Sequence, residues 1–299
     1  MLRKLKLAGL TLALTALCTG TVYAHALWVN INESFTHPPG HVITSLGWGH
    51  AMPLDDFLMS EAGAVEIEKY SLVGPDNSIT PIPLPVIKQE NATNSKTGMT
   101  IVPGDLGLRK ISLTDKTIPG TYQVTAESKA TYFTGYVDAK GKHKMTTKPM
   151  DEIKGAKSFN FSTRYKAVGK SYFGIERWTQ PKPVGYELEI LPETDMSAVK
   201  AGDLVKFTVT LNGKPLTCDM KGMNYLHMTS NTFGGPDQYM LTAYIMEGKA
   251  QIRVPTAGAW MASVTVKKEV TKDNDLKNLV KKCQSIYYGA TVSFTAKPK

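Results

Sequence analysis

The feature that most constrains the fold is a succession of short strand-like segments separated by turn residues. Segments that alternate apolar and polar residues, or that are rich in β-branched residues, are typical of strands. Turns such as Pro119-Gly120 and Asn212-Gly213 separate many of them. Many short strands with regular turns favour the packing of sheets into sandwiches. The predicted strands cover residues 41–46, 65–72, 120–128, 158–163, 185–190, 204–211, 250–254, 259–266 and 287–296.

A linker near residues 179–186 divides the chain. Its proline and polar content is typical of a connection between domains. We therefore predict a mostly β protein with two β-sandwich domains, over residues 25–180 and 186–299, the second of them immunoglobulin-like. Two helices are predicted, over residues 53–60 and 273–284. The lysine-rich segment 138–157 is predicted to be an exposed loop.

The first 24 residues have the three parts of a signal peptide: a basic start, an apolar stretch and a small-residue cleavage site. Cleavage after Ala24 would leave His25 as the new amino terminus, whereas cleavage after Ala26, which also fits, would remove it. We expect a protein that works outside the cytoplasm, in the periplasm. No later apolar run is long enough to span a membrane.

The net charge of the chain bears on the kind of partner that it can bind. The formal charge of +9 falls to about +6 without the signal peptide, and the lysines are scattered rather than set in an aromatic–basic motif, so we expect no nucleic-acid partner.

Once Cys18 is removed with the signal peptide, Cys218 and Cys283 remain. In an oxidising compartment the simplest expectation is one disulfide between them. The alternative is a pair of thiolate metal ligands.

Histidines provide the sharpest chemical signal. Four of the six lie at the start of the mature chain: His25, His37, His41 and His50. Neutral imidazole is a common ligand of nickel, copper and zinc. A terminal His25 would offer its α-amine and its ring together, and His50, His41 or His37 would add another imidazole. Each histidine taken alone could equally be an ordinary polar or hydrogen-bonded loop residue.

The loop around His50 supports a binding role. Gly47 and Gly49 flank Trp48 and permit a constrained loop with close backbone approach. Asp55 and Asp56 follow within reach, as further ligands or as partners that orient an imidazole. The alternative is a core tryptophan between turn glycines, with Asp55 capping a short helix. No nucleophile elbow, phosphate loop or zinc-protease helix occurs, so we expect binding and not an enzyme.

The start His25-Ala26-Leu27-Trp28, the Gly47-Trp48-Gly49-His50 loop and C-terminal turns such as Lys200-Ala201-Gly202-Asp203 and Ala257-Gly258-Ala259-Trp260 resemble the bacterial DUF4198 family. That resemblance implies a periplasmic accessory or substrate-binding protein of nickel or cobalt uptake. It implies a divalent transition metal held by His25 and His50, with His41 and His37 as weaker candidates. A membrane metal transporter would be the partner.

Three hypotheses follow. The first is the metal-binding protein, for nickel or cobalt, although a nitrogen-rich site would bind copper at least as tightly and zinc is also possible. The second is a structural or adhesive surface protein without a metal. The third is a copper-dependent oxidative enzyme with a histidine brace, which would need a flat aromatic substrate face that Trp28, Trp48 and Trp178 could supply.

Overall fold

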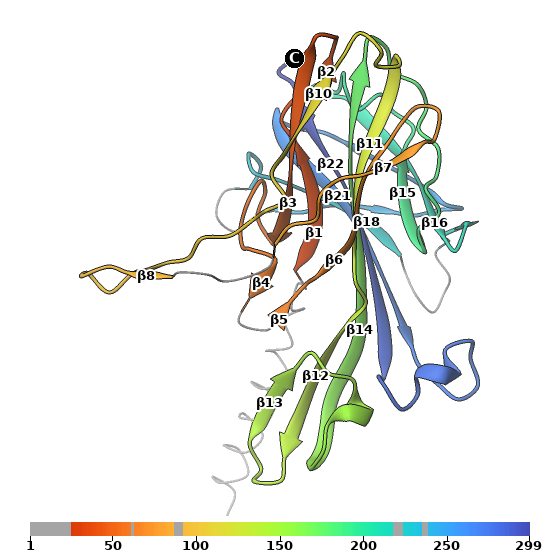
Figure 1. Ribbon diagram of the computed structural model, residues 1–299. Coiled ribbons are helices and arrows are strands. Elements are labelled where there is room, and N and C mark those ends of the chain that lie inside the picture. Colours follow the sequence, from red (N-terminus) through yellow and green to blue (C-terminus); the bar gives the residue numbers. More distant parts are fainter. Residues whose placement is uncertain (1–24, 61–62, 87–91, 218–223, 235–238) are drawn as a thin grey trace, which may run out of the picture.

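A computed structural model describes residues 25–60, 63–86, 92–217, 224–234 and 239–299 (Figure 1). The regular secondary structure of the described residues consists of strands and two short 3₁₀ turns, so the predicted mostly β class is confirmed. The strands of the first half are β1 (Ala26–Ile31), β2 (Phe35–Thr36), β3 (Gly40–Gly49), β4 (Met59–Ser60), β5 (Gly63–Ala64), β6 (Ile67–Val73), β7 (Ile79–Pro81), β8 (Thr93–Asn94), β9 (Thr100–Ile101), β10 (Arg109–Leu113), β11 (Gly120–Ser128), β12 (Thr131–Asp138), β13 (His143–Thr146) and β14 (Ala156–Ile175).

The second half adds eight strands. They are β15 (Leu188–Pro192), β16 (Leu204–Leu211), β17 (Lys214–Pro215), β18 (Tyr225–Ser230), β19 (Leu241–Tyr244), β20 (Lys249–Arg253), β21 (Gly258–Glu269) and β22 (Ser285–Ala296). The only helical elements in the described residues are two short 3₁₀ turns, η1 (Met150–Glu152) and η3 (Lys277–Leu279).

One long sheet runs through the molecule in the order β19-β18-β21-β22-β14-β11-β6-β7. The twenty-residue β14 pairs in parallel with β22, which joins strands from the two halves of the chain. Two smaller sheets cover it at separate places. One is β1-β3-β10, and the other consists of β15, β16, β17 and β20. The fold is therefore two sandwich packings that share a long central sheet.

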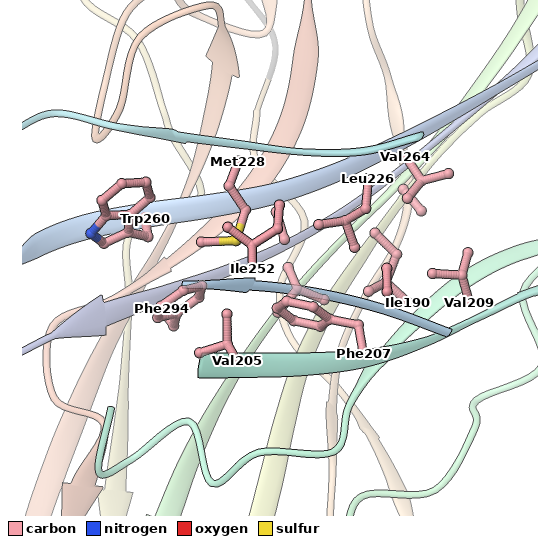
Figure 2. Close-up of a cluster of buried hydrophobic side chains, with 14 of the residues drawn as sticks. Ile190, Val205, Phe207, Val209, Leu226, Met228, Ile252, Trp260, Val264 and Phe294 are labelled. Atoms are coloured by element: carbon pink, nitrogen blue, oxygen red, sulfur yellow. The ribbon is translucent and has the colours of Figure 1, made fainter. Parts of the chain in front are cut away.

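Each packing has its own hydrophobic core. The first lies between β1 and β3 on one side and β6, β11 and β14 on the other, and it includes Leu27, Leu46, Trp48, Tyr70 and Phe173. The second is drawn in Figure 2, where Phe207 and Ile190 face Leu226, Trp260 and Phe294. Two antiparallel sheets packed face to face over such a core are the arrangement of immunoglobulin-like domains.

The predicted domain boundary falls in the connection between β14 and β15, and the two cores draw mainly on the two predicted ranges. The pairing of β14 with β22 nevertheless carries one sheet across that boundary. The division of the chain into residues 25–180 and 186–299 as separate folding units therefore stays a prediction.

Two local predictions are wrong. Residues 53–60 form a loop that ends in β4, because Asp56 pairs with Trp48 through a backbone bridge and is held there instead of starting a helix. Residues 273–284 contain only the single turn η3, since Asn274 holds the entry to this turn with side-chain bonds to Leu276 and Glu269. The lysine-rich segment 138–157 is exposed as predicted, but it contains β13 and η1.

Several predictions fall on residues that the structure does not describe. The predicted signal peptide, residues 1–24, lies outside the described part of the chain, and so does Cys218. Cys283 is a buried thiol, and burial raises its pKa. The predicted Cys218–Cys283 pairing therefore stays a prediction.

Candidate metal-binding site

The register of β1 and β3 places His25 opposite His50. The two strands pair antiparallel, with Leu27 opposite Trp48 and Ala26 opposite Gly49 at the end of the ladder. The next position along both strands is His25 facing His50. Because directly opposed residues of an antiparallel pair point to the same face, the two imidazoles meet. Their ring centroids are 4.5 Å apart.

The same alternation places the two imidazoles at the edge of the first core. Leu27 and Trp48 are buried on this face of the small sheet, and His25 and His50 are the next pair toward solvent. The His25 ring meets the Trp48 ring edge-on at 5.3 Å. His25 is half-buried, whereas His50 is 47% exposed. The imidazole pair thus has a packed inner wall and an open outer side.

Gly47 and Gly49 make this end of β3 possible. A Cβ on Gly47 would overlap the indole ring of Trp28, which packs on the opposite face of the sheet. Gly49 has φ +126°, and a Cβ there would collide with the Asp55 carboxylate. Both glycines are therefore needed, because they let the Trp28 ring and the Asp55 carboxylate lie close to the backbone of β3, as the sequence indicated.

Asp55 fixes the turn that carries His50. Its Oδ2 accepts a hydrogen bond from the His50 backbone N–H at 2.7 Å and lies 3.7 Å from the His50 Nδ1. Asp56 is held differently: its backbone N–H donates to the Trp48 carbonyl at 3.0 Å, and its Oδ1 accepts from the backbone N–H of Phe57. Both carboxylates thus shape the loop beside the imidazoles.

Burial and the neighbouring His50 lower the pKa of His25, and they outweigh the opposing effect of Asp56 and Asp55. A lowered pKa keeps the His25 imidazole neutral at neutral pH, with a lone pair available. Neutral imidazole is the form that binds metal ions.

Tyr165 supports the His25 backbone, a role that the sequence did not reveal. Its hydroxyl donates to the His25 carbonyl at 3.1 Å, and its ring lies edge-on to Trp48 at 6.0 Å. Complete burial raises the pKa of Tyr165, so the hydroxyl stays neutral and keeps its proton to donate. No local signal could have found this contact, because the two residues are far apart in the sequence and meet only through the packing of β1 on β14.

The structure removes His41 and His37 from the candidate site. His41 lies at the other end of the ten-residue β3, where it faces Ser112 of β10. At the usual rise of about 3.3 Å per residue, it is about 30 Å from His50. His37 is exposed in the turn before β3, at the same far end. The prediction that either could complete the site fails because an extended strand separates its two ends.

The donor set within the described residues is two imidazoles. In this part of the chain, no group of three or more His, Cys, Asp or Glu side chains is close enough together to hold a metal ion. A pair of imidazoles leaves room for a further nitrogen donor, and the α-amine of His25 would be next to the pair if the chain began there. The residues present therefore fit a metal only with a free amino terminus at His25.

Trp28, Trp48 and Trp178 do not share an exposed face of the kind considered for a histidine-brace enzyme. Trp28 is 0% exposed and Trp48 is 2% exposed, so neither ring is available to a substrate surface. Trp178 packs against the second core instead.

The described residues contain no helix that is long and apolar enough to cross a bilayer.

Several solved structures are similar to the chain over most of its length. Murine CEACAM1b is 12% identical, over 91% of this chain and 100% of that one, with a TM-score of 0.20. Salmonella alpha-2-macroglobulin reacted with methylamine is 11% identical, over 93% of this chain and 15% of that one, with a TM-score of 0.23. A DUF4785 family protein from Legionella pneumophila is 8% identical, over 82% of this chain and 52% of that one, also at 0.23. These likenesses carry no functional argument.

No curated protein matches the chain. The sequence profile of the family described as "Domain of unknown function (DUF4198)" matches residues 22–268, which include both imidazoles, the first core and most of the second. A match over most of the chain bears out the resemblance noted in the sequence: the chain belongs to the DUF4198 family.

Proposed function

We propose that the mature chain is a periplasmic protein that binds one divalent transition-metal ion as its cargo at His25 and His50. The single observation behind the proposal is the direct opposition of the two rings, 4.5 Å apart, at the end of a paired strand ladder. Strand pairing holds both backbones before any ion arrives, so binding would cost little ordering of the chain.

The surroundings of the two rings support the same proposal. The lowered pKa of His25 favours the neutral ligand form, and the Asp55 contact orients the turn that carries His50. Partners that orient a ligand commonly strengthen metal binding. The third nitrogen would be the α-amine that cleavage after Ala24 releases, and α-amines lose their proton more readily than lysine side chains do.

Nitrogen ligands suit nickel and cobalt, and we propose one of these as the physiological ion, delivered to a membrane metal transporter. Copper binds nitrogen ligands more tightly than nickel or cobalt in general, so tight copper binding in solution is expected whichever ion is carried. The identity of the cargo is therefore tested by the metal content of the protein isolated from cells rather than by affinity alone.

The experiment is a calorimetric titration of the chain starting at His25 with Ni²⁺, Co²⁺ and Cu²⁺. We expect one ion per chain. A matched sample in which the α-amine of His25 is acetylated keeps both imidazoles and blocks the terminal amine, and it should bind much more weakly. His143→Ala, on an exposed strand, is the control that should change nothing. Failure of the parent chain to bind any of the three ions would contradict the proposal.

A further inference from the structure

The net positive charge of the mature chain is concentrated in two segments, residues 138–157 and 267–284. Each contains six lysines, three acidic residues and no arginine, so each carries a formal excess of three positive charges. The whole chain has 35 basic and 26 acidic residues, and three of the basic ones precede His25, which leaves an excess of six. The two segments thus account for all of it, and the rest of the mature chain is balanced.

The two segments form one end of the molecule, which we call the lysine end. The Met150 backbone N–H donates to the Lys282 carbonyl at 2.9 Å, and the Gln284 N–H donates to the Ser162 carbonyl at 2.8 Å. In Figure 1 the β12–β13 hairpin with the lower part of β14, and the turn between β21 and β22, make up the lower end of the picture. Charges far apart in the sequence therefore add in one place.

The lysines of this end face solvent. Eleven of the twelve are exposed, and Lys268 is half-buried. Within the described residues, the only ion pair that any of the twelve makes is the one between Lys267 and Glu269, at 3.5 Å. The ammonium groups are therefore directed outward, and their charge is available to a partner.

Two exposed apolar side chains lie on the strands of the same end. Met145 is 56% exposed and Phe161 is 42% exposed, and both are opposite Gly135 in the register of β13, β12 and β14. A Cβ on Gly135 would overlap the Phe161 ring, so the glycine lets this ring lie flat across β12. An apolar row beside a lysine cluster is the combination that binds the boundary between lipid headgroups and acyl chains.

We propose that the lysine end docks on the surface of an anionic lipid bilayer. Lysine is a flexible point charge, whereas specific pairing with carboxylates or phosphates favours the planar guanidinium of arginine, which is absent here. The charge is spread over two projecting tips, which suits an extended anionic surface. This docking does not involve His25 or His50, and it would bring the protein to a membrane whether or not it carries a metal.

The test is co-sedimentation of the chain starting at His25 with vesicles of equal parts phosphatidylglycerol and phosphatidylcholine, compared with phosphatidylcholine alone. We expect binding only to the anionic vesicles, and release when the salt concentration rises. The first variant combines Lys140→Gln, Lys142→Gln, Lys144→Gln and Lys148→Gln. The matched control makes the same change in charge at exposed lysines elsewhere and combines Lys110→Gln, Lys116→Gln, Lys206→Gln and Lys214→Gln.

Because each lysine near an anionic surface adds to the attraction, the first variant should bind at least about tenfold more weakly. The control variant should bind like the parent, and so should His25→Ala. Equal losses in the two four-lysine variants would mean that only net charge matters, and they would overturn the assignment of this end. Absence of binding to anionic vesicles, or binding to polyglutamate in its place, would overturn the lipid partner. Circular dichroism of each variant verifies that the fold is intact.

Discussion

The two ends of β3 carry the same kind of side chain but have different surroundings. At one end His50 meets His25, beside the packed Trp48 and a turn held by Asp55. At the other end His41 is exposed and faces Ser112 of β10. Four histidines close together in the sequence thus become one pair and two isolated residues.

The difference shows that register, and not closeness in the sequence, brings imidazoles together. A ten-residue strand separates His41 from His50, while His25 reaches His50 because the chain turns back after β1 and pairs antiparallel. A shift of register by one residue would direct one of the two imidazoles to the opposite face of the sheet. The buried Leu27–Trp48 pair next to the site fixes this register.

The largest expected effect is the loss of either ring of the pair. His25→Ala and His50→Ala should each weaken Ni²⁺ binding by about a hundredfold or more, because losing a ligand costs at least as much as losing a residue that orients one. Calorimetric titration measures this. Binding as tight as that of the parent chain in either variant would remove that histidine from the site.

A change in the packing beneath the pair should come next. In Gly47→Ala the new methyl group overlaps the Trp28 ring, and overpacking of this kind destabilises a protein by about 1–3 kcal/mol. The matched control is Gly289→Ala on β22, where the nearest atom to a new Cβ is 3.7 Å away. Urea unfolding measures both. Equal stability of the two variants would show that β1 does not pack on β3 as described.

A smaller effect is expected from the turn that carries His50. Asp55→Ala removes the acceptor of the His50 backbone N–H and should weaken Ni²⁺ binding by about tenfold, because partners that orient ligands contribute on this scale. Asp115→Ala, an exposed carboxylate near the His41 end, makes the same change in charge as a control. A similar loss in both would reduce the role of Asp55 to long-range electrostatics.

The smallest effect is expected at the far end of β3. His37→Ala and His41→Ala should leave Ni²⁺ affinity within about twofold of the parent, since changes at distant independent sites do not couple. The same titration measures them. A tenfold loss of affinity in either variant would contradict the difference between the two ends of β3, because it would require a metal site that reaches along the whole strand.

Much of the fold was predictable from the sequence because each strand has a local pattern of alternating or β-branched residues between turn residues. The predicted segments 120–128 and 204–211 coincide with β11 and β16. The parallel pairing of β14 with β22 was not predictable, since it joins segments more than a hundred residues apart and no local pattern encodes it. The helix over residues 273–284 failed because Asn274 side-chain bonds compete with helical ones.

The candidate site was half predictable. His25, His50 and Asp55 were identified from residue type and spacing, and the structure brings them together. The sequence could not choose among His50, His41 and His37, because that choice depends on the register of β1 on β3. The alternation of Leu27 with Val29 and of Leu46 with Trp48 indicates two strands that each bury one face, but it does not show which residues of the two strands are paired.

The most direct test of the central claim, that His25 and His50 hold one ion together, is a double-mutant cycle measured by Ni²⁺ titration. We predict one ion per parent chain. The double variant of His25→Ala and His50→Ala should bind no more than about threefold more weakly than either single variant, because removal of one ring already disables the shared site. Losses that simply add, or two ions per parent chain, would contradict the claim and place the two histidines in separate sites.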